Sequence, residues 1–70
     1  MTTKQADRLI KTGEVVLFNS YLGDTFYGKV IRRHRSDVYI SWADTASEVG
    51  EAGQLALFSR TDIQIVKIVK

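Results

Sequence analysis

The sequence predicts a mainly β domain in which a short N-terminal helix precedes a five-stranded, strongly bent open barrel. Segments rich in β-branched and aromatic residues recur along the chain, as is typical of strands. The segment 26–32 alternates in polarity and carries Gly28 inside it. A glycine within a strand marks a bulge, a sharp bend or a close backbone approach, and a small barrel needs such a bend to close.

The seventy residues predict one domain spanning 1–70, with 1–12 as a helix or tail and 14–69 as the barrel. A chain this short buries only roughly 60% of its unfolded surface, so it usually relies on disulfides, metals or oligomerisation. Cysteine is absent and there is one histidine, so we expect no disulfide, no metal site and no cofactor. The remaining ways to stabilise the fold are a well-packed barrel and self-association.

The composition is that of a globular chain, with 44% hydrophobic and 26% charged residues. The net charge of +2 permits an anionic partner without requiring one. No run of 18 apolar residues occurs, which argues against a membrane partner. The segment Met1 to Lys11 is polar and lacks the apolar centre of a signal peptide, so we expect a cytoplasmic protein.

The N-terminal helix is predicted from good helix formers in the stretch "TTKQADRLIK". Thr2 or Thr3 is placed to cap its start, and Gly13 is placed to end it. The alternative is a frayed terminus without a fixed structure.

Five strands are expected after the helix. In the second, Phe26, Gly28 and Val30 share one face, and in the third, Val38 and Ile40 share a face with Trp42. The predicted strands are Glu14–Phe18, Phe26–Arg32, Asp37–Trp42, Gln54–Phe58 and Ile63–Val69.

The connection 43–53 between the third and fourth strands is expected to be a loop that turns at Gly50 and Gly53. Asp44, Glu48 and Glu51 make this loop acidic, so it would repel phosphate groups. Residues 59–62, "SRTD", form a tight turn before the last strand, because serine and aspartate favour local side-chain turns.

The last strand presents apolar groups at Ile63, Ile65, Val66, Ile68 and Val69, which regular alternation would place on both faces. Such a strand is normally covered on both faces, and an uncovered one is prone to aggregate. Pairing with a neighbouring subunit is therefore expected. The alternative is that the N-terminal helix of the same chain covers this strand.

The motif "GDTFYG" contains Gly23, Phe26 and Gly28 at the spacing of the first motif of the Sm-like (Lsm) family. The preceding "VVLF", Val30 and the helical stretch "KQADRLIK" extend the match, and the chain resembles this family, within it the bacterial Hfq proteins. The resemblance covers nearly all of the chain and implies the Sm-like fold, an SH3-like open barrel. Two departures stand out: His34 takes a position where the family has aspartate, and Phe58-Ser59-Arg60 replaces the second motif.

The resemblance implies a homo-oligomeric ring in which the fourth strand of one subunit pairs with the fifth strand of the next. Rings of this family commonly have six or seven subunits and bind single-stranded RNA, often U-rich, around a central pore. For this chain we expect U-rich or A-rich RNA as the partner. The interface residues expected from the two strands are Leu55, Leu57, Phe58, Ile63, Ile65, Val66 and Ile68.

In such rings the loops after the second and fourth strands line the pore. The residue types suit RNA, because arginine pairs with phosphate and stacks on bases, and histidine stacks as well. The alternative is a solvated charged turn, in which Arg32 pairs with Asp37. The candidate RNA-binding residues are Arg33, His34, Arg35, Ser36, Ser59 and Arg60 in these loops, with Lys4 and Gln5 on the helix.

A second class, the SH3-like or Tudor-like barrels that bind proteins without RNA, also fits the pattern "GEVVLF…GKV…VYISW". An enzyme is not expected. The single histidine lies in a basic turn with no evident nucleophile, and the carboxylates of the loop 43–53 show no sign of the burial that tunes a catalytic acid or base.

Overall fold

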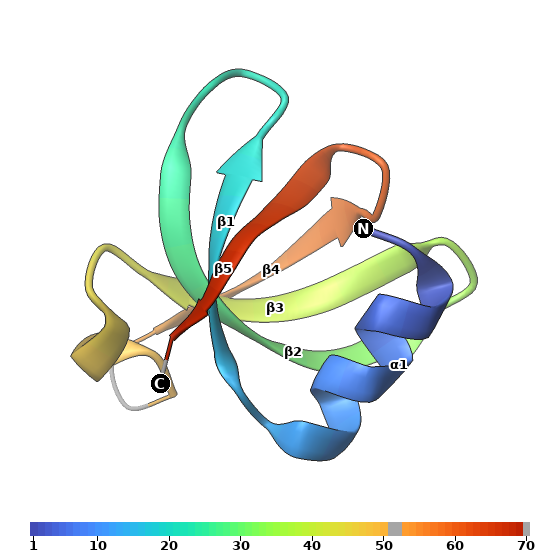
Figure 1. Cartoon of the computed structure of the whole chain (residues 1–70), viewed down its shortest axis with the longest axis horizontal. Coiled ribbons are helices and arrows are strands. Elements are labelled where there is room, and N and C mark those ends of the chain that lie inside the picture. The colour runs from blue at the N-terminus through green and yellow to red at the C-terminus, as the bar shows by residue number, and fades with distance from the viewer. Residues whose placement is uncertain (51–52, 70) are drawn as a thin grey trace.

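A computed structural model describes residues 1–50 and 53–69 of the chain. It confirms the predicted fold class, with one N-terminal helix followed by five antiparallel strands in one open sheet (Figure 1). No helix in the described part is long and apolar enough to cross a membrane. Glu51, which we counted in the acidic loop, lies outside the described residues. The elements are α1 (Thr3–Thr12), β1 (Val15–Ser20), β2 (Thr25–His34), β3 (Asp37–Ala43), the 3-10 helix η1 (Ala46–Glu48), β4 (Gln54–Ser59) and β5 (Ile63–Val69).

Helix α1 begins and ends at the residues that the sequence indicated. Thr2 is the N-cap and forms a capping box with Gln5, and Gly13 closes the helix in the left-handed conformation with φ 68°. Ala6 and Leu9 are the buried residues of the helix. The helix packs mainly against β2, and its buried residues Ala6 and Leu9 belong to the same core cluster as Ile63 of β5.

The strand order is β4-β3-β2-β1-β5, which leaves β4 and β5 as the two edges of the sheet. Residues 25–28 of β2 pair with β1 and residues 27–34 pair with β3, so this one strand connects the two sides of the barrel. Two edges without a partner in the same chain carry unpaired backbone groups, which can template pairing with another chain.

Gly28 lies at the closest approach inside the barrel. A Cβ atom built there would lie 2.5 Å from Cγ2 of Ile40 and 3.3 Å from Cε2 of Phe18. The glycine in the second strand therefore marks a close approach, one of the roles that the sequence predicted. The core around it consists of Ala6, Leu9, Val16, Phe18, Phe26, Val30, Val38, Ile40 and Ile63.

Two irregularities change which face a side chain occupies. In β2 the pairing shifts between Val30 and Arg32, so that Ile31 is an extra residue. In β5 the partners of Leu17 and Phe18 are Lys67 and Ile65, so Val66 is extra. A bulge of this kind reverses the alternation of the residues that follow it. Ile31 and Val66 are both exposed.

Candidate nucleic-acid interface

The turn between β2 and β3 meets the turn between β4 and β5. The backbone N–H of Arg60 donates to the carbonyl oxygen of Ser36 over 2.9 Å. His34, Arg35 and Ser36 are exposed, and Ser59 and Arg60 are half-buried. The structure thus brings five of the candidate RNA-binding residues into one group, which we call the turn cluster.

The amino group of Met1 is held in the turn cluster. It donates to the carbonyl oxygens of Arg60 at 3.0 Å and Ile63 at 2.9 Å, and Nη1 of Arg60 donates to the carbonyl oxygen of Met1 at 3.4 Å. Burial, and then the positive charge of Arg60, lower the pKa of this amine. Sequence reasoning missed the contact, because no local pattern joins positions about 60 residues apart.

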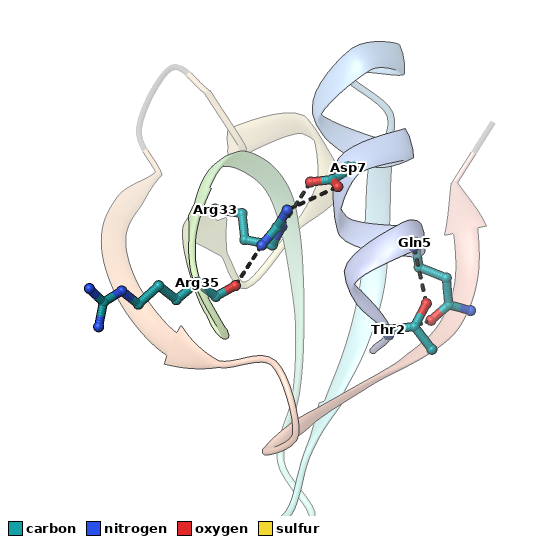
Figure 2. A network of polar contacts seen from close by, with 5 residues as sticks. All are labelled: Thr2, Gln5, Asp7, Arg33 and Arg35. Atoms are coloured by element: carbon teal, nitrogen blue, oxygen red, sulfur yellow. Dashed lines mark hydrogen bonds and ion pairs between the residues drawn. The ribbon is translucent and has the colours of Figure 1, made fainter.

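Arg33 is bound by the helix. Its Nε and Nη2 atoms donate to Oδ1 and Oδ2 of Asp7 at 2.8 and 3.1 Å (Figure 2). Hydrogen bonding to Arg33, together with the attraction of its charge, holds the pKa of the Asp7 carboxyl below its usual range. Nη1 of Arg33 donates to the carbonyl oxygen of Arg35 at 2.7 Å. The Nε, Nη1 and Nη2 groups of Arg33 therefore all donate to acceptors in the same chain. Arg33 therefore fixes the position of the turn.

Arg35 combines a fixed backbone with a free side chain. Its φ of 59° lies in the left-handed region, which disfavours residues other than glycine, asparagine and aspartate. Its carbonyl oxygen is held by Arg33, while Figure 2 shows its side chain extending away from the helix. This arrangement presents a guanidinium to solvent from a defined position.

The bulge at Ile31 explains why Arg32 and Arg33 differ. Directly paired residues share a face, so Arg33 lies on the face of its partner Val38, which is buried, and can reach the helix. Arg32 shares the other face with its partner Tyr39, and its Cζ atom lies 4.5 Å from the centre of that ring. The cation–π contact with Tyr39 takes the place of the pairing with Asp37 that we considered.

The two helix residues proposed for RNA differ in availability. The side-chain oxygen of Gln5 accepts the backbone N–H of Thr2 at 2.9 Å, so it is part of the capping box. Lys4 is exposed in the first turns of α1. Lys4 is therefore better placed than Gln5 to contact a ligand.

The residues predicted for the subunit interface fall into three groups. Leu55, Leu57 and Val66 are exposed by 65%, 53% and 53%, whereas Ile63 is fully buried in the core. Phe58, Ile65 and Ile68 are partly buried and pack against the core.

The bulge at Val66 accounts for the apolar pattern of β5. Regular alternation would place Ile65 and Ile68 on opposite faces, but the extra residue turns both toward the core. The apolar residues of β5 therefore do not by themselves require an outside cover. The exposed apolar edge is β4, whose sequence "QLALFS" contains no charged residue.

The turn cluster thus presents His34 and Arg35 to solvent, and Arg60 is joined to the same turn through its hydrogen bond to Ser36. Planar groups that carry positive charge can bind phosphates and stack on unpaired bases. Comparisons with models of protein families, with curated proteins and with solved structures find no match.

Proposed function

We propose that the protein forms an Sm-like homo-oligomeric ring that binds single-stranded RNA at the turn cluster. The observation that carries the proposal is the contact between Arg60 and Ser36, because it unites two arginine-containing turns that are distant in sequence. The resemblance in "GDTFYG" supports the same function, since the corresponding turns line the pore in that family.

Assembly increases the effect of a modest charge. The chain carries a net charge of only +2, but each subunit of a ring contributes another copy of the turn cluster. Repetition around a pore would concentrate positive potential where a phosphate chain passes. RNA binding should then weaken steeply as the salt concentration rises, because bound phosphates release their counterions.

The ring requires the two edges of the sheet to meet between subunits. β4 and β5 are those edges, and Leu55 and Leu57 leave β4 with exposed apolar side chains. Backbone pairing between β4 of one subunit and β5 of the next would satisfy both edges and bury these side chains. Both strands connect to the β4–β5 turn, so assembly and RNA binding would share one scaffold.

The test is the binding of fluorescent oligo-U and oligo-A to the assembled protein at low salt. A variant with His34→Ala, Arg35→Gly and Arg60→Gln should lose affinity by about tenfold or more, because it removes the imidazole and the two guanidinium groups of the turn cluster. Glycine is chosen at Arg35 because it tolerates the φ of 59°.

The control is Arg8→Gln with Lys11→Gln, which removes two positive charges from exposed positions of α1 outside the turn cluster. This variant should keep most of the affinity, and both variants should keep the assembly of the unaltered protein. RNA affinity that survives the triple substitution would show that the turn cluster is not the binding site. Absence of binding to either oligonucleotide at low salt would remove RNA from the proposal.

A further inference from the structure

A pocket of about 560 Å³ lies where the β1–β2 turn faces the ends of β3 and β4. Aromatic residues of the core contribute to its lining, including Phe26 and Trp42, whose rings meet edge to face with centroids 6.1 Å apart. The β4–β5 turn contributes Ser59 and Asp62, so the pocket shares Ser59 with the turn cluster but does not include Arg60. Neither the fold nor the proposed RNA interface assigns a role to it.

The rim of the pocket is apolar and exposed. Tyr21 and Leu22 in the β1–β2 turn are 74% and 73% exposed, and Leu57 on β4 is 53% exposed. These three are half of the six large apolar side chains that are exposed in the described part of the chain. Apolar side chains gathered at one concave place, with polar groups among them, are typical of a docking site.

The charge of the lining is opposite to that of the chain. Asp24, Asp44 and Asp62 line the pocket, and the lining includes no lysine, arginine or histidine. In the chain as a whole basic residues exceed acidic ones, giving the net charge of +2. Within residues 1–50 and 53–69, no three carboxylate or imidazole side chains lie close enough to hold a metal ion together. The pocket thus offers three carboxylates and no basic side chain to a cationic group.

We propose that this pocket binds an arginine side chain that a partner protein presents between apolar neighbours. The guanidinium stacks on aromatic rings and pairs with carboxylates in a defined geometry. Its aliphatic stem and the flanking apolar residues cover Tyr21, Leu22 and Leu57. A nucleic acid is excluded as the occupant, because its phosphates would meet three carboxylates. The inference does not depend on RNA binding, and one subunit supplies every residue of the pocket. Leu57 also lies in the proposed contact between β4 and β5 of neighbouring subunits, so ring assembly would leave only Tyr21 and Leu22 of this rim for the partner.

The test uses the blocked tripeptide acetyl-Leu-Arg-Leu-amide, titrated into the full-length ¹⁵N-labelled protein up to millimolar concentration. We expect saturable shifts of the amide signals of Tyr21, Leu22, Asp44 and Leu57. Peptides with glutamate or lysine in the central position are the comparisons. The glutamate peptide should not bind. The lysine peptide should bind more weakly than the arginine peptide, because an ammonium group neither stacks on an aromatic ring as a plane nor forms two parallel hydrogen bonds to a carboxylate.

The variant Asp24→Asn/Asp44→Asn/Asp62→Asn should weaken binding of the arginine peptide by about tenfold, because it removes the combined attraction of three solvent-exposed carboxylates for the guanidinium. The matched control Glu14→Gln/Asp37→Asn/Glu48→Gln removes the same charge outside the pocket and should stay within about twofold. Thermal unfolding of both variants checks that they are folded. If the triple variant does not fold, Asp44→Asn alone should weaken binding about twofold.

Four outcomes would overturn the proposal: no saturable shifts, shifts centred elsewhere, equal binding of the lysine or glutamate peptide, and affinity unchanged in the aspartate variants. Shifts in the pocket on dilution of the protein, with none on addition of peptide, would assign the pocket to a second copy of the chain. Displacement of the arginine peptide by oligo-U from the pocket itself would assign it to RNA. The RNA measurement with the turn-cluster variant is independent, so the two proposals fail separately.

Discussion

The absence of a side chain at Gly28 allows β2 to lie close to the side chains of Ile40 and Phe18. An added Cβ would lie 2.5 Å from Cγ2 of Ile40, and both Ile40 and its neighbour Phe18 are fully buried. Gly28→Ala should therefore reduce the free energy of unfolding by about 1–3 kcal/mol through overpacking. Urea denaturation measures this loss.

A second variant tests the steric explanation by combining Gly28→Ala with Ile40→Leu. Leucine lacks the Cγ2 methyl group that the new Cβ at position 28 would meet. The double variant should lose less stability than the sum of the two single variants, with a coupling of about 1 kcal/mol. Strict additivity would contradict the steric explanation.

The ion pair between Asp7 and Arg33 predicts a specific response to pH. Hydrogen bonding to Arg33 lowers the pKa of Asp7 in the folded protein. The pair therefore contributes to stability above the ordinary pKa of aspartate, and the contribution is lost as pH falls through the lowered pKa. The Cγ chemical shift of Asp7, followed by NMR, should titrate below the ordinary range and return to it in Arg33→Gln. An unchanged midpoint in that variant would contradict the pairing.

Single residues also show where sequence reasoning succeeds. Thr2 and Gly13 were expected as the ends of the helix, since their capping chemistry is local. The ion pair of Asp7 with Arg33 was not expected. It depends on which face Arg33 occupies, and the bulge at Ile31 reverses that face. Regular alternation, read along the sequence, cannot reveal an extra residue.

Among the elements, β4 and β5 differ more than their sequences suggested. The apolar residues on both faces of β5 were the main reason to expect assembly. The bulge in β5, however, turns Ile65 and Ile68 toward the core of the same chain. β4 emerges instead as the exposed apolar edge, with Leu55 exposed by 65%. Of the side chains predicted for the interface, Leu55, Leu57 and Val66 are exposed and Ile63 is buried, and both strands lie at an edge as that interface requires.

A substitution in β4 tests the role of this edge. Leu55→Lys places a charge on the exposed apolar edge strand and should convert the oligomer to monomers, because a charged edge strand resists pairing. The control Ile31→Lys makes the same change at an exposed position of β2, which lies within the sheet, and should leave the assembly intact. Sedimentation velocity compares the two. An oligomer that persists in Leu55→Lys would exclude the β4 edge as the contact.

At the scale of the whole molecule, the fold places distinct chemistry on the two sides of one turn. Arg60 faces the amino terminus and Ser36 on one side, while Asp62 lines the acidic pocket on the other. The sequence predicted the helix and the strands, and the family resemblance implied that the β2–β3 and β4–β5 turns both line a pore. It did not predict the pocket, because Tyr21, Asp44 and Leu57 come from three separate segments that only the folded barrel brings together.

The central claim is that this small barrel works as a ring. Native mass spectrometry at micromolar concentration, with and without oligo-U, tests it most directly. The account predicts one closed species at an integer multiple of the 7.9 kDa subunit, which gains the mass of bound RNA at low salt. A 7.9 kDa monomer under the same conditions would contradict the claim.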